Sequence, residues 1–179
     1  SKWRISGGFF RLNYVFNDRY LLEVNGRLDG SSKFPSDSQY AFFPSVSAGW
    51  RVSQEPFWKV PEEIFSNLKV RASYGSLGNG NIDPYSFQEL FKIKQSSLVL
   101  NGIRPQYTGQ PAVIPLGLTW EKSTTLNLGL DFAFLSNRLQ FSGDIYQRKT
   151  TDMFTVGMSL PAVFGTDVPK GNYADCLLY

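Results

Sequence analysis

The chain has 179 residues, a net charge of +3, one cysteine and no histidine. The missing histidine excludes the usual general base and the commonest metal ligand, and a lone cysteine excludes a disulfide framework. No basic run predicts nucleic-acid binding, and no stretch approaches the roughly 20 apolar residues of a membrane-spanning helix. We therefore expect no enzyme, cofactor, metal ion or nucleic-acid partner.

Period-two alternation of apolar and polar residues recurs along the chain, as in strands that have one apolar face. In residues 19–30, for example, Tyr20, Leu22, Val24 and Leu28 alternate with mostly charged or amide side chains. The pattern predicts strands over residues 10–16, 19–30, 43–52, 68–75, 125–134 and 139–145, and a less regular strand over 173–179.

The predicted connections differ in length. Asn17-Asp18 and residues 136–138 predict tight turns, whereas residues 30–39 and about 78–118 form longer loops. We expect the longer loop to contain a hairpin that pairs residues 85–93 with 97–103. In the connection 53–67, Pro61 and the two glutamates after it predict one short helical turn. Parity then places the tight turns and this connection at one end and the long loops at the other, the plan of an outer-membrane barrel.

Alternation alone also fits a soluble antiparallel sandwich or barrel with an apolar interior. Three features favour a membrane barrel. The apolar faces are rich in leucine and phenylalanine over about nine residues, the length of a tilted spanning strand. Aromatic residues cluster near strand ends, as interfacial girdles require, and the opposite faces carry both signs of charge with small residues, which suits a polar lumen.

Several blocks of the chain, in this order, resemble the barrel of SusC/RagA-type TonB-linked outer-membrane transporters. They read FFRLNYVFNDRYLLEVNGRLDGSSKF, FFPSVSAGWRVSQEPF, SNLKVRASYGSLGN and LTWEKSTTLNLGLDFAFLSNRLQFSGDIYQRKTTDMF. The tail LPAVFGTDVPKGNYAD resembles the family's next segment, so the likeness runs from about Gly8 to Asp175. The last residues, Cys176 to Tyr179, depart from the family pattern.

The resemblance implies an all-β fold. Residues 1–179 would form one partial domain, about six to eight antiparallel transmembrane strands of a barrel of about 22, with long extracellular loops. It also implies a bacterial outer-membrane location and import of oligosaccharides or peptides. The implied partners are outer-membrane lipid, a SusD-like surface lipoprotein, TonB and the remaining barrel strands.

We expect no counterpart of the family's signal peptide, plug domain or TonB-contacting segment within these 179 residues. We therefore expect a piece of a larger barrel, a partner that completes one, or a smaller sheet. A standalone small barrel or accessory wall protein with a structural or adhesive role is one alternative function, and a soluble β-sandwich binding module is another.

Two sets of residues are candidate sites. The first set is expected to face the lumen, either as a polar path for the solute or as charge pairs against the plug: Glu23, Arg27, Lys69, Arg71, Asn127 and Asp131. The second set lies in the long loop and would contact substrate or pack within the loop: Tyr85, Phe87, Phe91 and Tyr107. The oxygen-rich stretch Asn79–Asp83 lacks the distal glutamate of a calcium loop, so we expect a plain turn there.

Overall fold

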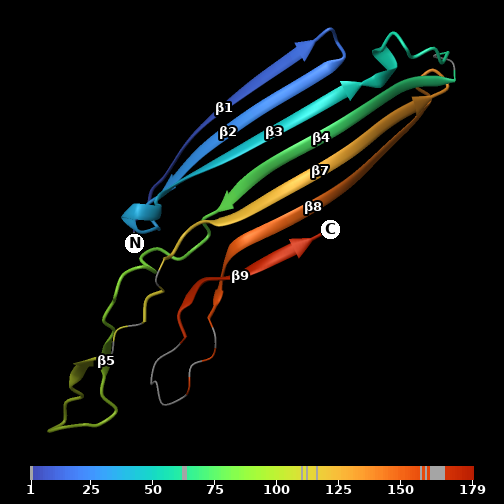
Figure 1. Ribbon diagram of the computed structural model, residues 1–179. Coiled ribbons are helices and arrows are strands. Elements are labelled where there is room, and N and C mark those ends of the chain that lie inside the picture. Colours follow the sequence, from blue (N-terminus) through green and yellow to red (C-terminus); the bar gives the residue numbers. More distant parts are fainter. Residues whose placement is uncertain are drawn as a thin grey trace.

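The described strands form one open antiparallel sheet and a small separate hairpin (Figure 1). This computed structural model describes residues 2–61, 64–109, 111, 113–115, 117–157, 159, 161 and 168–179. The strands of the sheet are β1 (Ile5–Phe16), β2 (Tyr20–Ser31), β3 (Tyr40–Arg51), β4 (Phe65–Asn79), β7 (Glu121–Phe134), β8 (Leu139–Val156) and β9 (Lys170–Leu178). Their order in the sheet is their order in the sequence, and β1 and β9 form its two edges.

All seven predicted strands are confirmed, including the less regular last one, which becomes β9. Several are longer than predicted, most clearly β8, which continues from residue 145 to Val156. This extension contains Gln147, Arg148, Lys149 and Thr150 in succession, so its two faces are both polar and the alternation disappears. The backbone pairing continues regardless, since Lys149 still lies opposite Thr124. Hydropathy therefore predicts the apolar part of each strand and misses its polar extension.

The short connections lie together at one end of the sheet (Figure 1). Asn17 and Asp18 both have positive φ, and the Arg19 amide donates to the Phe16 carbonyl at 3.0 Å, which closes a tight turn between the paired residues Phe16 and Tyr20. Between β7 and β8, the Arg138 amide donates to the Leu135 carbonyl at 3.2 Å. Both predicted tight turns are therefore confirmed.

The connection from β3 to β4 begins with a 3-10 turn, η2 (Val52–Gln54), and lies at the same end as the tight turns (Figure 1). The predicted helical turn falls on Glu62 and Glu63, which lie outside the described residues. On its described flanks, the amides of Ile64 and Phe65 donate to the Pro61 carbonyl at 3.0 and 3.1 Å.

The long loops leave the opposite end of the sheet (Figure 1). The shorter one contains η1 (Ser36–Ser38), and the longer one contains β5 (Ile93–Gln95) paired with β6 (Gln106–Thr108). The expected pairing of residues 85–93 with 97–103 is therefore wrong. Residues 84–87 form a turn instead, and the bridge between Leu100 and Ile103 lies at the hairpin tip.

A small hydrophobic cluster joins the loops where they leave the sheet. Phe34 from the β2–β3 loop contacts Ile82 and Leu118 from the two ends of the long connection, and all three are buried. The Trp120 ring stacks on Phe34 with centroids 4.7 Å apart. Its indole nitrogen donates to the carbonyl of Ser38 at 3.0 Å. Both loops are thus fixed at their bases to each other and to the start of β7.

The fold class is all-β, as predicted. The described strands of the large sheet form a single layer and not two sheets packed face to face (Figure 1). None of the helical segments among the described residues is long and apolar enough to cross a membrane.

Candidate functional site on the polar face of the sheet

The strand register aligns side chains in rows that cross the sheet. Because neighbours along a strand point to opposite faces, residues directly paired across strands share a face. One row is apolar: Tyr14, Leu22, Ala48, Ala72, Leu128 and Ile145. The adjacent row is mostly polar: Asn13, Glu23, Ser47, Ser73, Asn127 and Tyr146. The sheet therefore has one apolar and one polar face, as the alternation predicts.

All six residues expected to face the lumen lie on the polar face, namely Glu23, Arg27, Lys69, Arg71, Asn127 and Asp131. They do not form one site. Arg71, Asn127 and Asp131 belong to a hydrogen-bonded cluster on β4, β7 and β8. Glu23 and Arg27 lie on β2, in two separate polar groups.

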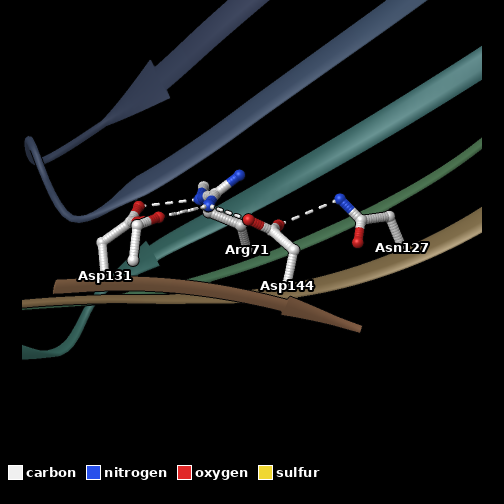
Figure 2. Close-up of polar contacts among 5 residues, drawn as sticks. Arg71, Asn127, Asp131 and Asp144 are labelled. Carbon is white, nitrogen blue, oxygen red and sulfur yellow. Dashed lines mark hydrogen bonds and ion pairs between the residues drawn. The ribbon is translucent and has the colours of Figure 1, made fainter. Parts of the chain in front are cut away.

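Arg71 is the centre of the first group, which we call the Arg71 cluster: Arg71, Asn127, Asp131, Ser142 and Asp144 (Figure 2). Its guanidinium donates to both carboxylate oxygens of Asp131, at 2.7 and 2.9 Å. The same guanidinium lies 3.3 Å from Asp144, and the Ser142 hydroxyl donates to Asp131 at 2.6 Å. Bidentate pairs of this kind are stronger and more directional than single surface ion pairs.

Gly129 leaves the space that the Arg71 cluster needs. In the register, Gly129 lies between Arg71 on β4 and Asp144 on β8. A Cβ atom at this position would lie 2.6 Å from the Asp144 carboxylate and 2.9 Å from the guanidinium carbon of Arg71. The long arginine side chain therefore crosses β7 over the glycine to reach β8, and it connects three strands on the polar face.

Asn127 lies at one end of the Arg71 cluster, and only the nitrogen of its side-chain amide takes part in the hydrogen bonds of the cluster. Its amide nitrogen donates to Asp144 at 3.1 Å, as Figure 2 shows. Its amide oxygen is buried and has no hydrogen-bond partner within the described part of the chain. A buried acceptor left unpaired costs free energy, so this oxygen favours any donor that can approach it.

The polar groups on β1 and β2 are smaller. The Arg11 guanidinium donates to Asn25 at 2.8 Å, and Asn25 donates to Glu23 at 2.7 Å. Arg27 pairs with the buried carboxylate of Asp29 at 2.7 Å. An open hollow of about 510 Å³ separates Glu23 from the Arg71 cluster, and Lys69 lines it with Arg71 and Asn127.

Chemically, these groups can offer hydrogen bonds to a polar solute, and they join neighbouring strands of the sheet. The Arg71 guanidinium is engaged by two carboxylates. Among the described residues, no group of three or more histidine, cysteine, aspartate or glutamate side chains could hold a metal ion.

Sequence reasoning missed Glu55, which ties three residues together at the short-turn end. It accepts hydrogen bonds from the Tyr20 hydroxyl at 2.7 Å and the Trp50 indole at 3.0 Å, and pairs with Arg19 at 3.4 Å. The hydrogen bond from Tyr20, then that from Trp50, and the Arg19 charge hold the pKa of Glu55 below its usual range. A single glutamate in a loop carries no sequence signal for these contacts.

The four loop aromatics are not brought together. Phe87 packs against the buried Phe34 cluster, which favours loop packing for this residue. The Tyr85 hydroxyl donates to the carbonyl of Lys2 at 3.0 Å. Phe91 lies just before β5, Tyr107 lies in β6, and both are exposed. In the Asn79–Asp83 stretch, the Asn81 amide donates to the Asn79 side chain at 3.1 Å, and the Ile82 amide donates to the Gly80 carbonyl at 2.9 Å.

Comparison with known proteins places this geometry in a family. A family profile described as "TonB dependent receptor-like, beta-barrel" matches residues 3–175. TonB-dependent receptor P26 of Formosa agariphila is 41% identical over 155 residues, which cover 86% of this chain and 15% of that protein. TonB-dependent receptor SusC of Bacteroides thetaiotaomicron is 38% identical over 154 residues, which cover 81% of this chain and 15% of that protein.

Solved structures of the RagAB peptide transporter share the fold. One superposes with a TM-score of 0.81 at 26% identity, and covers 97% of this chain and 18% of that chain. The names of these relatives describe receptors and a transporter and not enzymes. The chain spans 15% of the length of the curated relatives above. With its open antiparallel sheet, alternating faces and match over nearly its whole length, the chain belongs to the TonB-dependent receptor β-barrel family, as a segment of the barrel that resembles SusC.

Proposed function

We propose that this chain is part of the wall of an outer-membrane importer, with its apolar face against lipid and its polar face toward a water-filled interior. The observation that carries the proposal is the separation of apolar and polar rows across six strands of a single-layer sheet. A single layer has no second sheet to bury its apolar face, and lipid can cover that face in a barrel wall.

The imported solute is an oligosaccharide or a peptide, and import draws on TonB through regions outside this chain. Membership of the receptor family and the likeness to SusC and RagAB support this assignment. The long loops lie at the extracellular end, where a SusD-like surface lipoprotein covers the barrel and where Phe91 and Tyr107 are exposed to solute. The remaining strands of the barrel complete the sheet at β1 and β9.

The six lumen-facing residues divide between two roles. Arg71, Asp131 and Asn127 brace the wall, because each makes hydrogen bonds within the Arg71 cluster. Glu23 and Lys69 line the hollow on the polar face and are the better candidates for contact with the solute or the plug. Arg27 pairs with Asp29 and acts in the wall.

A pair of adjacent cysteine substitutions in β3 tests the orientation of the wall. Val46→Cys and Ser47→Cys lie on opposite faces, and each is made in the full-length protein with Cys176→Ser to remove the native thiol. In native outer-membrane vesicles, a small hydrophilic maleimide should label Ser47→Cys at least several-fold faster than Val46→Cys. The reverse order, or equal rates, would contradict the proposed orientation.

Fractionation separates the alternatives. A soluble binding module would remain in the aqueous phase without detergent, whereas both a wall segment and a standalone small barrel would require detergent. Solute uptake by cells that carry the full-length protein, measured with labelled oligosaccharides and labelled peptides in parallel, distinguishes the two solute classes. Uptake of neither class would contradict the importer assignment.

A further inference from the structure

The apolar face contains a recess close to the short-turn end of the sheet. Its volume is about 320 Å³, within the range of about 300–1,000 Å³ that small-molecule sites occupy. The recess is lined chiefly by Tyr14, Tyr20, Leu22, Ala48, Trp50 and Ala72.

The strand register explains why the face is hollow here. Ala48 and Ala72 are direct neighbours on β3 and β4, and Leu22 and Leu128 flank them in the same row. The backbones of β2 and β7, which carry these leucines, are three strand spacings apart, roughly 14 Å. Two adjacent methyl side chains between two leucines therefore form a floor between higher walls.

The end of the recess nearest the turns is rigid. Tyr20 and Trp50 are paired across β2 and β3, and their rings stack with centroids 6.5 Å apart and an interplanar angle of 9°. Glu55 accepts a hydrogen bond from the polar end of each ring, and Arg19 pairs with Glu55. The aromatic wall is held in place before any ligand arrives, which lowers the entropy lost on binding.

The chemistry of the site points to a lipid. Tyrosine and tryptophan with hydrogen-bonded polar ends are typical of the level of the lipid headgroups. The alanine floor lies one row further from the turns, about 7 Å along the tilted strands and thus closer to the membrane centre, where acyl chains begin. Arg19 lies at the same level as the tyrosine and tryptophan, and its charge is paired with that of Glu55 at 3.4 Å.

We propose that this recess binds the acyl chain of a phospholipid from the inner leaflet of the outer membrane, with the lipid headgroup at the level of the polar ends of Tyr20 and Trp50. The proposal rests on the proposed function, because it requires the apolar face to contact lipid. It goes beyond that function in assigning one preferred lipid position on a face that otherwise meets exchanging lipid.

Photo-crosslinking tests the proposal. The full-length protein is reconstituted in vesicles of phosphatidylethanolamine and phosphatidylglycerol that contain a small fraction of phosphatidylethanolamine with a diazirine in its acyl chain. After irradiation, the modified peptides are mapped by mass spectrometry. We expect several-fold more modification on the β3 and β4 peptides that carry Ala48 and Ala72 than on the β7 and β8 peptides that carry Leu128 and Ile145.

Filling the recess provides the matched comparison. Ala48→Leu should reduce modification around Ala72 several-fold, because the new side chain occupies the floor. Gly143→Leu adds the same side chain to the apolar face at a position where a Cβ atom would have no neighbour within 4 Å, and should leave recess modification unchanged. Equal unfolding midpoints for the two variants would show that both proteins fold.

The outcomes distinguish a failure of the lipid site from a failure of the proposed function. Modification spread evenly over the apolar face, or unchanged by Ala48→Leu, overturns the lipid site and leaves the proposed function standing. No modification anywhere on the apolar face overturns both, because that face would then not meet lipid.

Discussion

The Arg71 cluster depends on the absence of a side chain at position 129. Replacing it with alanine places a Cβ atom within 2.6 Å of the Asp144 carboxylate and 2.9 Å of the Arg71 guanidinium carbon. One partner must move, so the contact that joins β4 to β8 weakens. Overpacking of this kind costs about 1–3 kcal/mol. We expect Gly129→Ala to lower the denaturant midpoint of the full-length protein in detergent.

Gly143→Ala is the control for this change. It lies on β8 on the opposite face, and no atom lies within 4 Å of the added carbon. Alanine loses less backbone entropy than glycine on folding, so this variant should be neutral or slightly more stable. If Gly129→Ala and Gly143→Ala lost the same stability, the crowding at position 129 would have no measurable cost, and the prediction would be wrong.

The lowered pKa of Glu55, at the short-turn end of the sheet, predicts that the stability of the folded protein depends on pH. Its pKa is lowered in the folded protein, first by the Tyr20 hydrogen bond and then by that of Trp50. In acid, the unfolded state therefore binds more protons at this carboxyl than the folded state, and stability rises with pH. The contribution is complete above the unfolded pKa and is lost as the pH falls through the lower folded pKa.

The variant Glu55→Gln removes this titration and should reduce the acid-induced drop in the unfolding midpoint between pH 7 and pH 3. Glu89→Gln, at an exposed loop position, should leave the drop unchanged. The measurement is the midpoint of thermal unfolding for the three full-length proteins across this range. An acid response of Glu55→Gln identical to that of the parent would refute the role given to this carboxylate.

At the scale of elements, the Phe34 cluster fixes the bases of two loops. Leu118 is 1% exposed and contacts Phe34 and Ile82, so Leu118→Ala leaves a cavity that costs about 2–5 kcal/mol locally. Hydrogen exchange in residues 30–39 and 79–87 should become faster while β1 to β3 stay protected. Leu100→Ala, at the exposed hairpin tip, makes the same chemical change and should leave both segments unaffected.

The strands were predictable because each strand has one apolar and one polar face. Apolar and polar residues therefore alternate along the sequence. The β5–β6 hairpin was not, because Phe87 packs into the buried cluster and residues 84–87 turn toward it. Arg71 and Asp131 could be assigned to one face from parity alone. Their link to Asp144 depends on the β7–β8 register, and the contacts of Glu55 depend on a loop that folds back onto β2 and β3.

At the scale of the whole molecule, the unpaired edges of β1 and β9 predict that the functional protein is larger than this chain. Each edge strand is hydrogen-bonded to one neighbour among the described residues, and a sheet in a membrane has no water to satisfy an open edge. The described sheet also does not close on itself, because β1 and β9 lie at opposite edges. The remaining wall must come from the same polypeptide or from another one.

The intact mass of the native protein decides between these two sources. The protein is extracted from outer membranes with detergent, denatured and measured by mass spectrometry. Because this chain matches only 15% of the length of each curated relative above, we expect a mass several times 20.2 kDa. A mass near 20.2 kDa would contradict the single-chain importer, and the edges of β1 and β9 would then have to pair with a second polypeptide.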